Sequence, residues 1–172
     1  RLVGYAAEGS HSCVKRAFDV LGLGSDALRL VPVKDDFTMD LDVLIQMVEA
    51  DQQAGNRPSM VIGTAGSVNV GAIDDLNGIA DVCDARGLWF HVDGAFGAMA
   101  ILSPEAAPLI SGMERASSLA FDFHKWAHVN YDAGCVLIRD HNAHLRAFSD
   151  RPDYLASNVR GIAGGSPWAV DY

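Results

Sequence analysis

Apolar residues recur at helical spacing in three segments of the chain. They are Val14, Ala17, Phe18 and Leu21; Leu41, Leu44, Met47 and Val48; and Leu76, Ile79, Ala80 and Cys83. Residues three or four apart share one face of a helix, so each set predicts an amphipathic helix with one buried face. Gly22, Gly55 and Gly87 follow the three sets, and glycine is a common helix end. Asp74 or Asp75 is the expected cap of the third helix.

Short apolar runs alternate with these helices. They are residues 28–33, 60–63, 88–92, 119–121 and 135–138. Runs of this length fit buried strands, and strands that alternate with amphipathic helices are typical of βαβ units. The pattern therefore predicts the α/β class, with a mainly parallel sheet flanked by helices.

Charge and cysteine content narrow the range of functions. The 172 residues include 13 Lys and Arg against 22 Asp and Glu, a formal net charge of −9. Such a chain repels phosphate backbones, so nucleic acid is not an expected partner. Cys13, Cys83 and Cys135 are isolated and odd in number, which favours reduced thiols and a cytoplasmic protein. No apolar run approaches the roughly 20 residues of a membrane-spanning helix, so we expect no membrane partner.

Two clusters of polar and small residues directly follow predicted strands. Residues 91–97 read His-Val-Asp-Gly-Ala-Phe-Gly, and residues 122–126 read Asp-Phe-His-Lys-Trp. Ligands of open α/β sheets bind beyond the carboxyl ends of the strands, where both clusters are expected. Alternation along a strand places His91 and Asp93 on one side, and Gly94 and Ala95 leave room for a flat group against the backbone.

A lysine and a carboxylate that converge on one crevice suggest pyridoxal phosphate. Lys125 would hold the cofactor aldehyde as a Schiff base, and Asp93 would pair with the pyridine nitrogen. Taken singly, Asp93 could equally form a structural salt bridge and Lys125 could be a solvated surface residue. The spacing of the pair carries the hypothesis.

The two clusters resemble the signature of the pyridoxal-phosphate-dependent group II amino-acid decarboxylases, the aromatic-L-amino-acid decarboxylase family. The resemblance covers nearly the whole chain. Its other segments are Ser-His-Ser at 10–12, Gly-Thr-Ala-Gly-Ser at 63–67, Gly-Ala-Ile-Asp at 71–74, Gly-Cys-Val-Leu at 134–137 and Pro-Asp-Tyr-Leu at 152–155.

The resemblance implies a role for each matching residue. Lys125 matches the Schiff-base lysine, Asp93 the partner of the pyridine nitrogen, and Ala95 the residue packed against one ring face. His11 matches the histidine that stacks on the other ring face and orients the substrate carboxylate. His124 matches a residue that contacts cofactor or substrate, and Tyr154 the loop tyrosine that protonates the product carbon.

Two positions depart from the family pattern and remain candidate cofactor contacts. Ser67-Val68 stands where the family often has two threonines, so one hydroxyl is lost. Asp122 stands where some members carry an asparagine that contacts the phosphate. A carboxylate there would repel the phosphate unless it points away or is itself paired.

The resemblance also implies a domain plan. Residues 1–148 would be the central portion of the fold-type I large domain that binds the cofactor. Residues 149–172, which are rich in Gly and Pro, would be a mobile active-site loop leading toward a C-terminal domain that is absent from the chain. Family members are homodimers, so a homodimer is expected here.

The expected function is therefore decarboxylation of an L-amino acid, an aromatic one by resemblance, to the amine and CO2. Three alternatives stay open. Another fold-type I lyase or aldehyde-forming reaction would use the same cofactor. A metal hydrolase would use His91, Asp93 and His124, although the sequence lacks an accompanying ligand motif. A non-catalytic fragment is the third.

Overall fold

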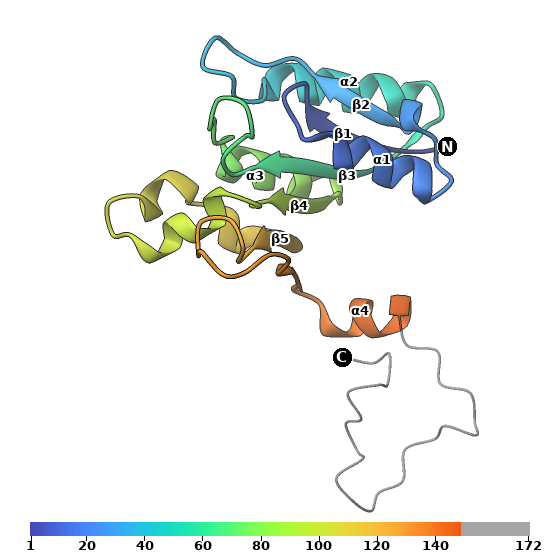
Figure 1. The fold of residues 1–172 in the computed structure, drawn as a ribbon. Coiled ribbons are helices and arrows are strands. Elements are labelled where there is room, and N and C mark those ends of the chain that lie inside the picture. The colour runs from blue at the N-terminus through green and yellow to red at the C-terminus, as the bar shows by residue number, and fades with distance from the viewer. Residues whose placement is uncertain (149–172) are drawn as a thin grey trace, which may run out of the picture. The chain divides into compact units, whose positions relative to one another are not determined.

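Six strands form one sheet in the computed structural model, which describes residues 1–148. The strand order is β2-β1-β3-β4-β5-β6 (Figure 1). The strands are β1 (Leu2–Ala7), β2 (Leu28–Val31), β3 (Arg57–Thr64), β4 (Trp89–Asp93), β5 (Ser118–Asp122) and β6 (Gly134–Ile138). β1 pairs in parallel with β2 and β3, β3 with β4, and β4 with β5. The predicted mainly parallel sheet is confirmed.

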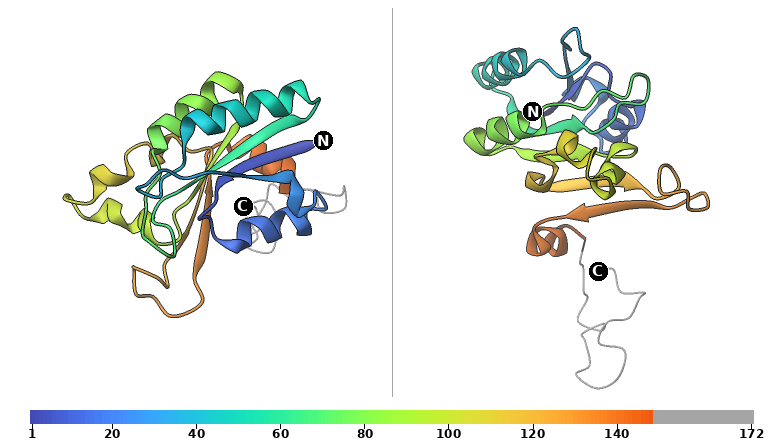
Figure 2. Two further views of the ribbon diagram at one scale, coloured as in Figure 1. Left: turned by 90° about the horizontal axis from the view of Figure 1, so that it is seen from above. Right: turned by 90° about the vertical axis from the view of Figure 1, so that its left-hand side faces the viewer.

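Helices cover both faces of this sheet. α2 (Leu41–Gln53) and α3 (Leu76–Arg86) lie on one face, and α1 (Ser12–Val20) lies on the other (Figure 2). Alternate residues of the strands supply two cores. Val3, Tyr5 and Ala7 of β1 belong to the core under α2 and α3, whereas Ala6 packs with Phe18 of α1. The flanking helices predicted from the apolar pattern are therefore confirmed.

The ends of the helices follow the expected chemistry. Gly87 adopts the left-handed conformation, with φ of 63°, directly after α3. Asp75 is the cap of that helix, because its side chain accepts a hydrogen bond from the Gly78 amide. Asp74 has a different use. It is buried and accepts hydrogen bonds from the amides of Met39 and Thr64 at 2.7 and 2.8 Å, which ties two loops to β3.

Several elements lie outside the predicted pattern. β1 was not predicted, and its Gly4 is required because an added Cβ would lie 2.6 Å from the Phe18 ring. β3 begins at Arg57 rather than at residue 60, and the hydroxyl of Ser59 donates to the Val3 carbonyl at 2.8 Å. Short 3-10 helices run between β4 and β5: Gly97–Leu102, Ala107–Ile110 and Met113–Arg115. A further 3-10 turn, Ser25–Ala27, precedes β2.

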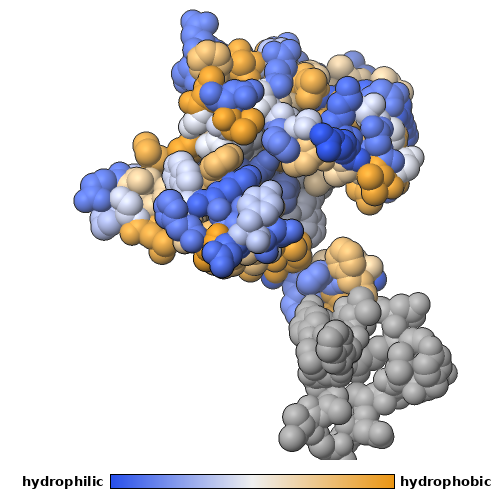
Figure 3. Space-filling view, viewed as in Figure 1, coloured by the Kyte–Doolittle hydropathy of each residue, from blue (hydrophilic) through white to orange (hydrophobic). Residues whose placement is uncertain are grey.

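The structure divides the chain after Leu137. The first unit comprises Arg1–Leu137, and the described part of the second contains α4 (His141–Phe148). The predicted loop segment at 149–172, with Tyr154, lies outside the described residues. Within residues 1–148, no helix has the length and apolar character needed to cross a membrane. On the face drawn in Figure 3, hydrophobic residues reach the surface in separate places among hydrophilic ones.

A charged network joins the neighbouring strands β1 and β2 to α2. Asp51 accepts hydrogen bonds from Arg29 Nε at 3.0 Å and Nη2 at 2.8 Å, from the Tyr5 hydroxyl at 2.9 Å and from Asn56 at 2.8 Å. The Arg29 guanidinium holds the pKa of the Asp51 carboxyl below its usual range, and the bonds from Tyr5 and Asn56 add to this effect. Asp51 thus links β1, β2 and α2 through one carboxylate.

Asp51→Asn should lower the free energy of unfolding by about 1–3 kcal/mol at neutral pH, since it leaves a partly buried guanidinium without its counter-ion. Urea denaturation of the full-length protein measures this loss. Because the pKa of Asp51 is lowered by folding, its contribution is complete above the ordinary carboxyl pKa and disappears as the pH falls through the folded-state pKa. The difference between wild type and variant should therefore shrink in acid.

Glu49→Gln is the matched control. Glu49 pairs with Arg86 at 3.2 Å, but its side chain is 54% exposed, so this change should cost less than about 0.5 kcal/mol. Equal losses in the two variants, or a loss for Asp51→Asn that stays constant into acid, would contradict the assigned role.

Candidate active site

A cavity of about 720 Å³ lies between α1 and the strands β3, β4 and β5. Side chains along β4 alternate between the two faces of the sheet, and one of these sets lines the cavity. Phe90 and Val92 point into the core under α2 and α3, whereas His91 and Asp93 line the cavity on the opposite face. Parallel register sets Asp93 beside Ala120 of β5, which lines the same cavity. The predicted shared side of His91 and Asp93 is confirmed.

Six of the eight candidate site residues line this one cavity. They are His11, Asp93, Ala95, Asp122, His124 and Lys125. They come from three places in the chain: the start of α1, the end of β4, and the end of β5 with the turn that follows it. Because these parallel elements end at one edge of the sheet, residues more than 100 positions apart meet there.

Lys125 is held by two different neighbours. Its Nζ lies 2.9 Å from Oδ2 of Asp122 and 4.3 Å from the ring centroid of Phe96. Asp122 sits three residues earlier, at the last position of β5, and the tight turn brings the two side chains together. The ion pair and the cation–π contact both favour an ammonium group at this point. Asp122 is therefore a paired carboxylate as long as Lys125 carries no bound cofactor.

Asp93 has one oxygen in use and one available. Its Oδ1 accepts a hydrogen bond from the Ala95 amide at 3.2 Å. Within residues 1–148, no donor is placed to bond its Oδ2, although the residue lies at the cavity wall. A carboxylate oxygen in such a position is suited to accept a hydrogen bond from a protonated ring nitrogen.

The expectation that Gly94 leaves room for a ligand is wrong. A Cβ on Gly94 would lie 2.8 Å from Cβ of Ala98 and 3.0 Å from Cδ1 of Leu119. The missing side chain is therefore required by the packing of the protein itself. Ala95, and not Gly94, lines the cavity.

Two of the three histidines at the cavity accept a hydrogen bond from a backbone amide. His124 Nδ1 accepts a hydrogen bond from the Ala133 amide at 2.9 Å, so a neutral ring carries its proton on Nε2, 3.8 Å from Oδ2 of Asp122. His11 is the N-cap of α1, and its Nδ1 accepts from the Cys13 amide at 3.2 Å. His11 therefore begins the helix that forms one wall of the cavity.

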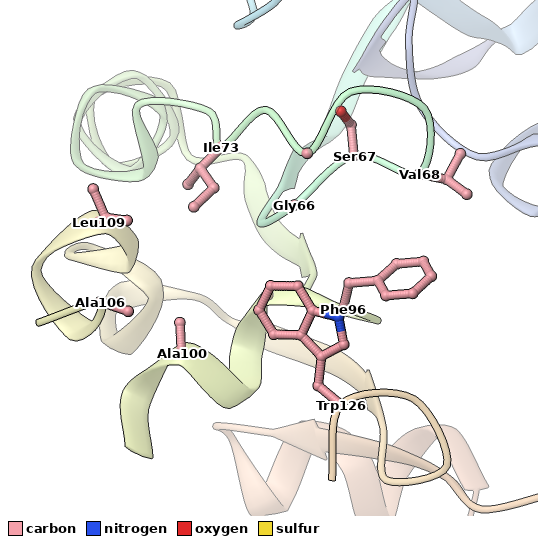
Figure 4. Close-up of a pocket in the computed structure, with 11 residues that line it drawn as sticks. Gly66, Ser67, Val68, Ile73, Phe96, Ala100, Ala106, Leu109 and Trp126 are labelled. Carbon is pink, nitrogen blue, oxygen red and sulfur yellow. The ribbon is translucent and has the colours of Figure 1, made fainter. Parts of the chain in front are cut away.

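Ser67 lies at a second pocket. This pocket, of about 280 Å³, is lined mostly by apolar groups, among them Phe96, Trp126, Val68 and Leu109 (Figure 4). No described residue lines both pockets. The hydroxyl of Ser67 accepts a hydrogen bond from the Ala72 amide at 3.0 Å, within its own loop. The structure thus does not bring Ser67 to the cavity of Lys125 and Asp93.

Some residues of the site were not singled out from the sequence. Phe96 lies under the Lys125 ammonium, Tyr131 packs its ring on His124 with centroids 4.2 Å apart, and Cys13 lines the cavity. Phe96 belongs to the 91–97 cluster, so that signal could have identified it. Tyr131 has no such signal, because the turn that returns it to His124 is not visible in the apolar pattern.

Within residues 1–148, no group of three or more His, Cys, Asp or Glu side chains is arranged to hold a metal ion. His91, Asp93 and His124 line one cavity without forming such a group. The metal-hydrolase alternative therefore gains no support from the geometry.

Comparison with known proteins identifies the family. Residues 1–170 match the pyridoxal-dependent decarboxylase conserved domain, and the chain belongs to this family. It is 35% identical over 160 residues to the aromatic-L-amino-acid decarboxylase of Bacillus atrophaeus, covering 93% of this chain and 33% of that protein. It is 35% identical to the histidine decarboxylase of Rattus norvegicus, covering 95% of this chain and 24% of that protein.

A solved structure shows the same fold. The crystal structure of mouse CSAD in apo form superposes with a TM-score of 0.87 at 31% identity, covering 94% of this chain and 34% of that chain. This chain thus spans a quarter to a third of the length of the two relatives named above.

The cavity fits the cofactor of this family. Lys125 supplies an amine, and Oδ2 of Asp93 has no hydrogen-bond donor within residues 1–148. Ala95 adds a small apolar side chain to the wall of the same cavity. Pyridoxal phosphate needs a lysine, a carboxylate for the ring nitrogen and a wall close to the ring. All three are present on one cavity.

Proposed function

We propose that the protein of which this chain forms part is a pyridoxal-phosphate-dependent amino-acid decarboxylase. The observation that carries the proposal is the convergence of Lys125 and Asp93 on one cavity, with Oδ2 of Asp93 open to a ligand. Membership of the pyridoxal-dependent decarboxylase family supports the reaction class. Residues 1–148 would then be the central portion of the large domain that binds the cofactor.

Bound pyridoxal phosphate supplies an electron sink for the pair of electrons left when the bond to the carboxylate breaks. Asp93 Oδ2 holds the proton at the ring nitrogen, which keeps that sink effective. Lys125 Nζ would anchor the cofactor aldehyde, and without that bond its ammonium group contacts Asp122 and Phe96. Ala95 would lie against one face of the ring, and His11, at the start of α1, would orient the substrate carboxylate at the other face.

The proposed substrate is an aromatic L-amino acid, converted to the amine and CO2. The similarity to the aromatic-L-amino-acid decarboxylase supports this choice. The chain is also 35% identical to a histidine decarboxylase, so histidine is the next substrate to be assayed. In the described residues, the walls of the cavity comprise apolar side chains of α1 and β3, among them Val14, Met60 and Ile62, which suit a ring better than a charged group.

Lys125→Ala in the full-length protein should abolish the visible absorption band that pyridoxal phosphate gives when it is attached to a lysine. Activity should fall by at least about 10³-fold, as expected when a covalent anchor is lost. Lys15→Ala, which removes an exposed lysine of α1 that does not line the cavity, should leave the band intact. A normal band in Lys125→Ala would refute the assignment of the lysine.

We propose Tyr154, outside the described residues, as the proton donor to the product carbon. Tyr154→Phe should slow amine formation by about 10²-fold or more, the usual loss on removing a general acid, while changing the Kd for pyridoxal phosphate little. Stopped-flow rates and a spectroscopic titration measure the two quantities. Similar losses in rate and in cofactor affinity would argue against a protonation role.

We propose that the protein is a homodimer and that the second pocket lies at the contact between subunits. Val68, Leu109 and Trp126 line this pocket (Figure 4). Between 50% and 64% of the surface of each of these residues is exposed. Apolar side chains that gather around a hollow and remain accessible are typical of a contact surface.

Leu109→Glu should therefore shift the full-length protein toward monomer, raising the dimer dissociation constant by about tenfold or more, since a buried charge would replace an apolar contact. Sedimentation velocity over a range of concentrations measures the shift. Val20→Glu, at a residue 86% exposed on α1, is the control and should leave association unchanged. A monomeric wild type, or equal effects of both variants, would overturn the proposal.

We also propose a cytoplasmic location. Cys13, Cys83 and Cys135 are all free thiols, which suits a reducing compartment.

A further inference from the structure

A hydrogen-bonded chain runs across the strands toward the cofactor cavity. Trp89, His91 and Asp93 occupy alternate positions of β4 and so share one face. Trp89 Nε1 donates to the hydroxyl of Ser118 at 2.7 Å, and His91 Nδ1 lies 2.7 Å from the same oxygen. Ser118 is the register partner of His91 on β5 and is buried, with 6% of its surface exposed.

Counting donors assigns the proton of His91. The indole of Trp89 can only donate, so it occupies one lone pair of Ser118 Oγ. The hydroxyl of Ser118 has one proton, and among the hydrogen bonds of residues 1–148 the contact with His91 Nδ1 is the one in which it can be donated. With Nδ1 as the acceptor of this bond, the ring of His91 carries its single proton on Nε2.

Protonation of His91 would disrupt this arrangement. A second proton on Nδ1 would turn it into a donor, and the buried hydroxyl of Ser118 would then lose the acceptor of its own proton. Burial lowers the pKa of His91, and the nearby Asp93 carboxylate opposes this effect without reversing it. The hydrogen bonds and burial act in the same direction, toward a neutral ring.

The charge of His91 matters because Asp93 is its neighbour on the same strand face. An imidazolium at this position would be a cation two residues from the carboxylate, and it would compete with a protonated ring nitrogen for that carboxylate. A neutral imidazole leaves the full charge of Asp93 to the cofactor.

We propose that His91 is a positioning residue, which Trp89 and Ser118 hold neutral so that Asp93 is reserved for the cofactor ring nitrogen. The part that concerns the cofactor rests on the proposed function, whereas the state of His91 does not. The other titratable side chains around the cavity are His11 and Cys13 from α1, and Asp122, His124, Lys125, Tyr131 and Asp132 from the end of β5 and the loop beyond it. Asp122 and Lys125 offset one another as an ion pair.

The state of His91 is tested without cofactor. In cofactor-free, full-length protein with 15N-labelled histidine, the His91 ring nitrogens should show a neutral ring protonated on Nε2 down to about pH 6, where an unperturbed histidine is mostly charged. His91→Asn identifies the resonances. A charged ring near neutral pH, or a proton on Nδ1, would overturn the proposal.

The effect on Asp93 is tested by the affinity for pyridoxal phosphate. Ser118→Ala removes the hydroxyl that donates to His91 Nδ1, so His91 can become charged as the pH falls. Between about pH 8 and pH 6, the Kd of this variant for pyridoxal phosphate should therefore rise about tenfold more than the Kd of wild type. His91→Asn in the Ser118→Ala background cannot take up a proton and should restore the wild-type dependence. The same weakening in the double variant would refute a role for His91.

Trp89→Phe removes the indole donor to Ser118 but keeps the bond between Ser118 and His91. The Kd of this variant for pyridoxal phosphate should show the same kind of pH dependence as that of Ser118→Ala, with a smaller change. The test therefore does not depend on the folding of Ser118→Ala. Ser117→Ala is the control, because the Ser117 hydroxyl accepts from the Phe90 amide, away from the cavity. If wild type and control both fail to bind pyridoxal phosphate, the proposed function fails, and the measurement on His91 still stands.

Discussion

The alternation of side chains along β4 is the constraint on which the site depends. Phe90 and Val92 are anchored in the core under α2 and α3, so His91 and Asp93 must face the opposite side. A shift of one residue in the register would place both polar side chains in an apolar core and remove the Asp93 carboxylate from the cavity. The five residues of β4 therefore determine both the packing and the site. Burial of Phe90 and Val92 on one face of the strand orients His91 and Asp93 toward the cavity on the other face.

The parallel sheet extends this constraint to the rest of the site. Its pairing brings the end of β4 beside the end of β5, and the turn after β5 then returns Lys125 toward Asp122 and Phe96. Two histidines are fixed by backbone amides, His11 by Cys13 and His124 by Ala133, and His91 is bonded to the Ser118 hydroxyl. Within the described residues, the polar groups of the cavity are thus oriented before any ligand arrives. Such preorganisation lowers the entropic cost of binding.

The sequence was most informative where one periodic signal decided the structure. The spacing of apolar residues predicted α1, α2 and α3, and short apolar runs predicted five of the six strands, because burial of one face is a local property of the pattern. β1 escaped prediction although it lies in the middle of the sheet, since Gly4 interrupts its run for a reason that becomes visible only when Phe18 is in place. The 3-10 helices between β4 and β5 have no apolar period to reveal them.

The site was predicted by the same logic and limited in the same way. Residues at the ends of parallel strands converge, so Asp93 and Lys125 could be placed together from their positions alone. The role of Gly94 could not, because whether a missing side chain serves a ligand or the protein depends on Ala98 and Leu119. Ser67 was assigned to the site from sequence similarity to the family. Its position depends instead on its loop, in which the Ser67 hydroxyl accepts a hydrogen bond from the Ala72 amide.

Phe96 forms a partition between two environments. One side of its ring receives the ammonium of Lys125, and the residue also lines the apolar pocket with Trp126. A movement of the Phe96 ring would therefore alter both the second pocket and the contact with the Lys125 amine. A substitution at position 96 would therefore change both the lining of the second pocket and the contact with Lys125, which restricts how independently the two can diverge.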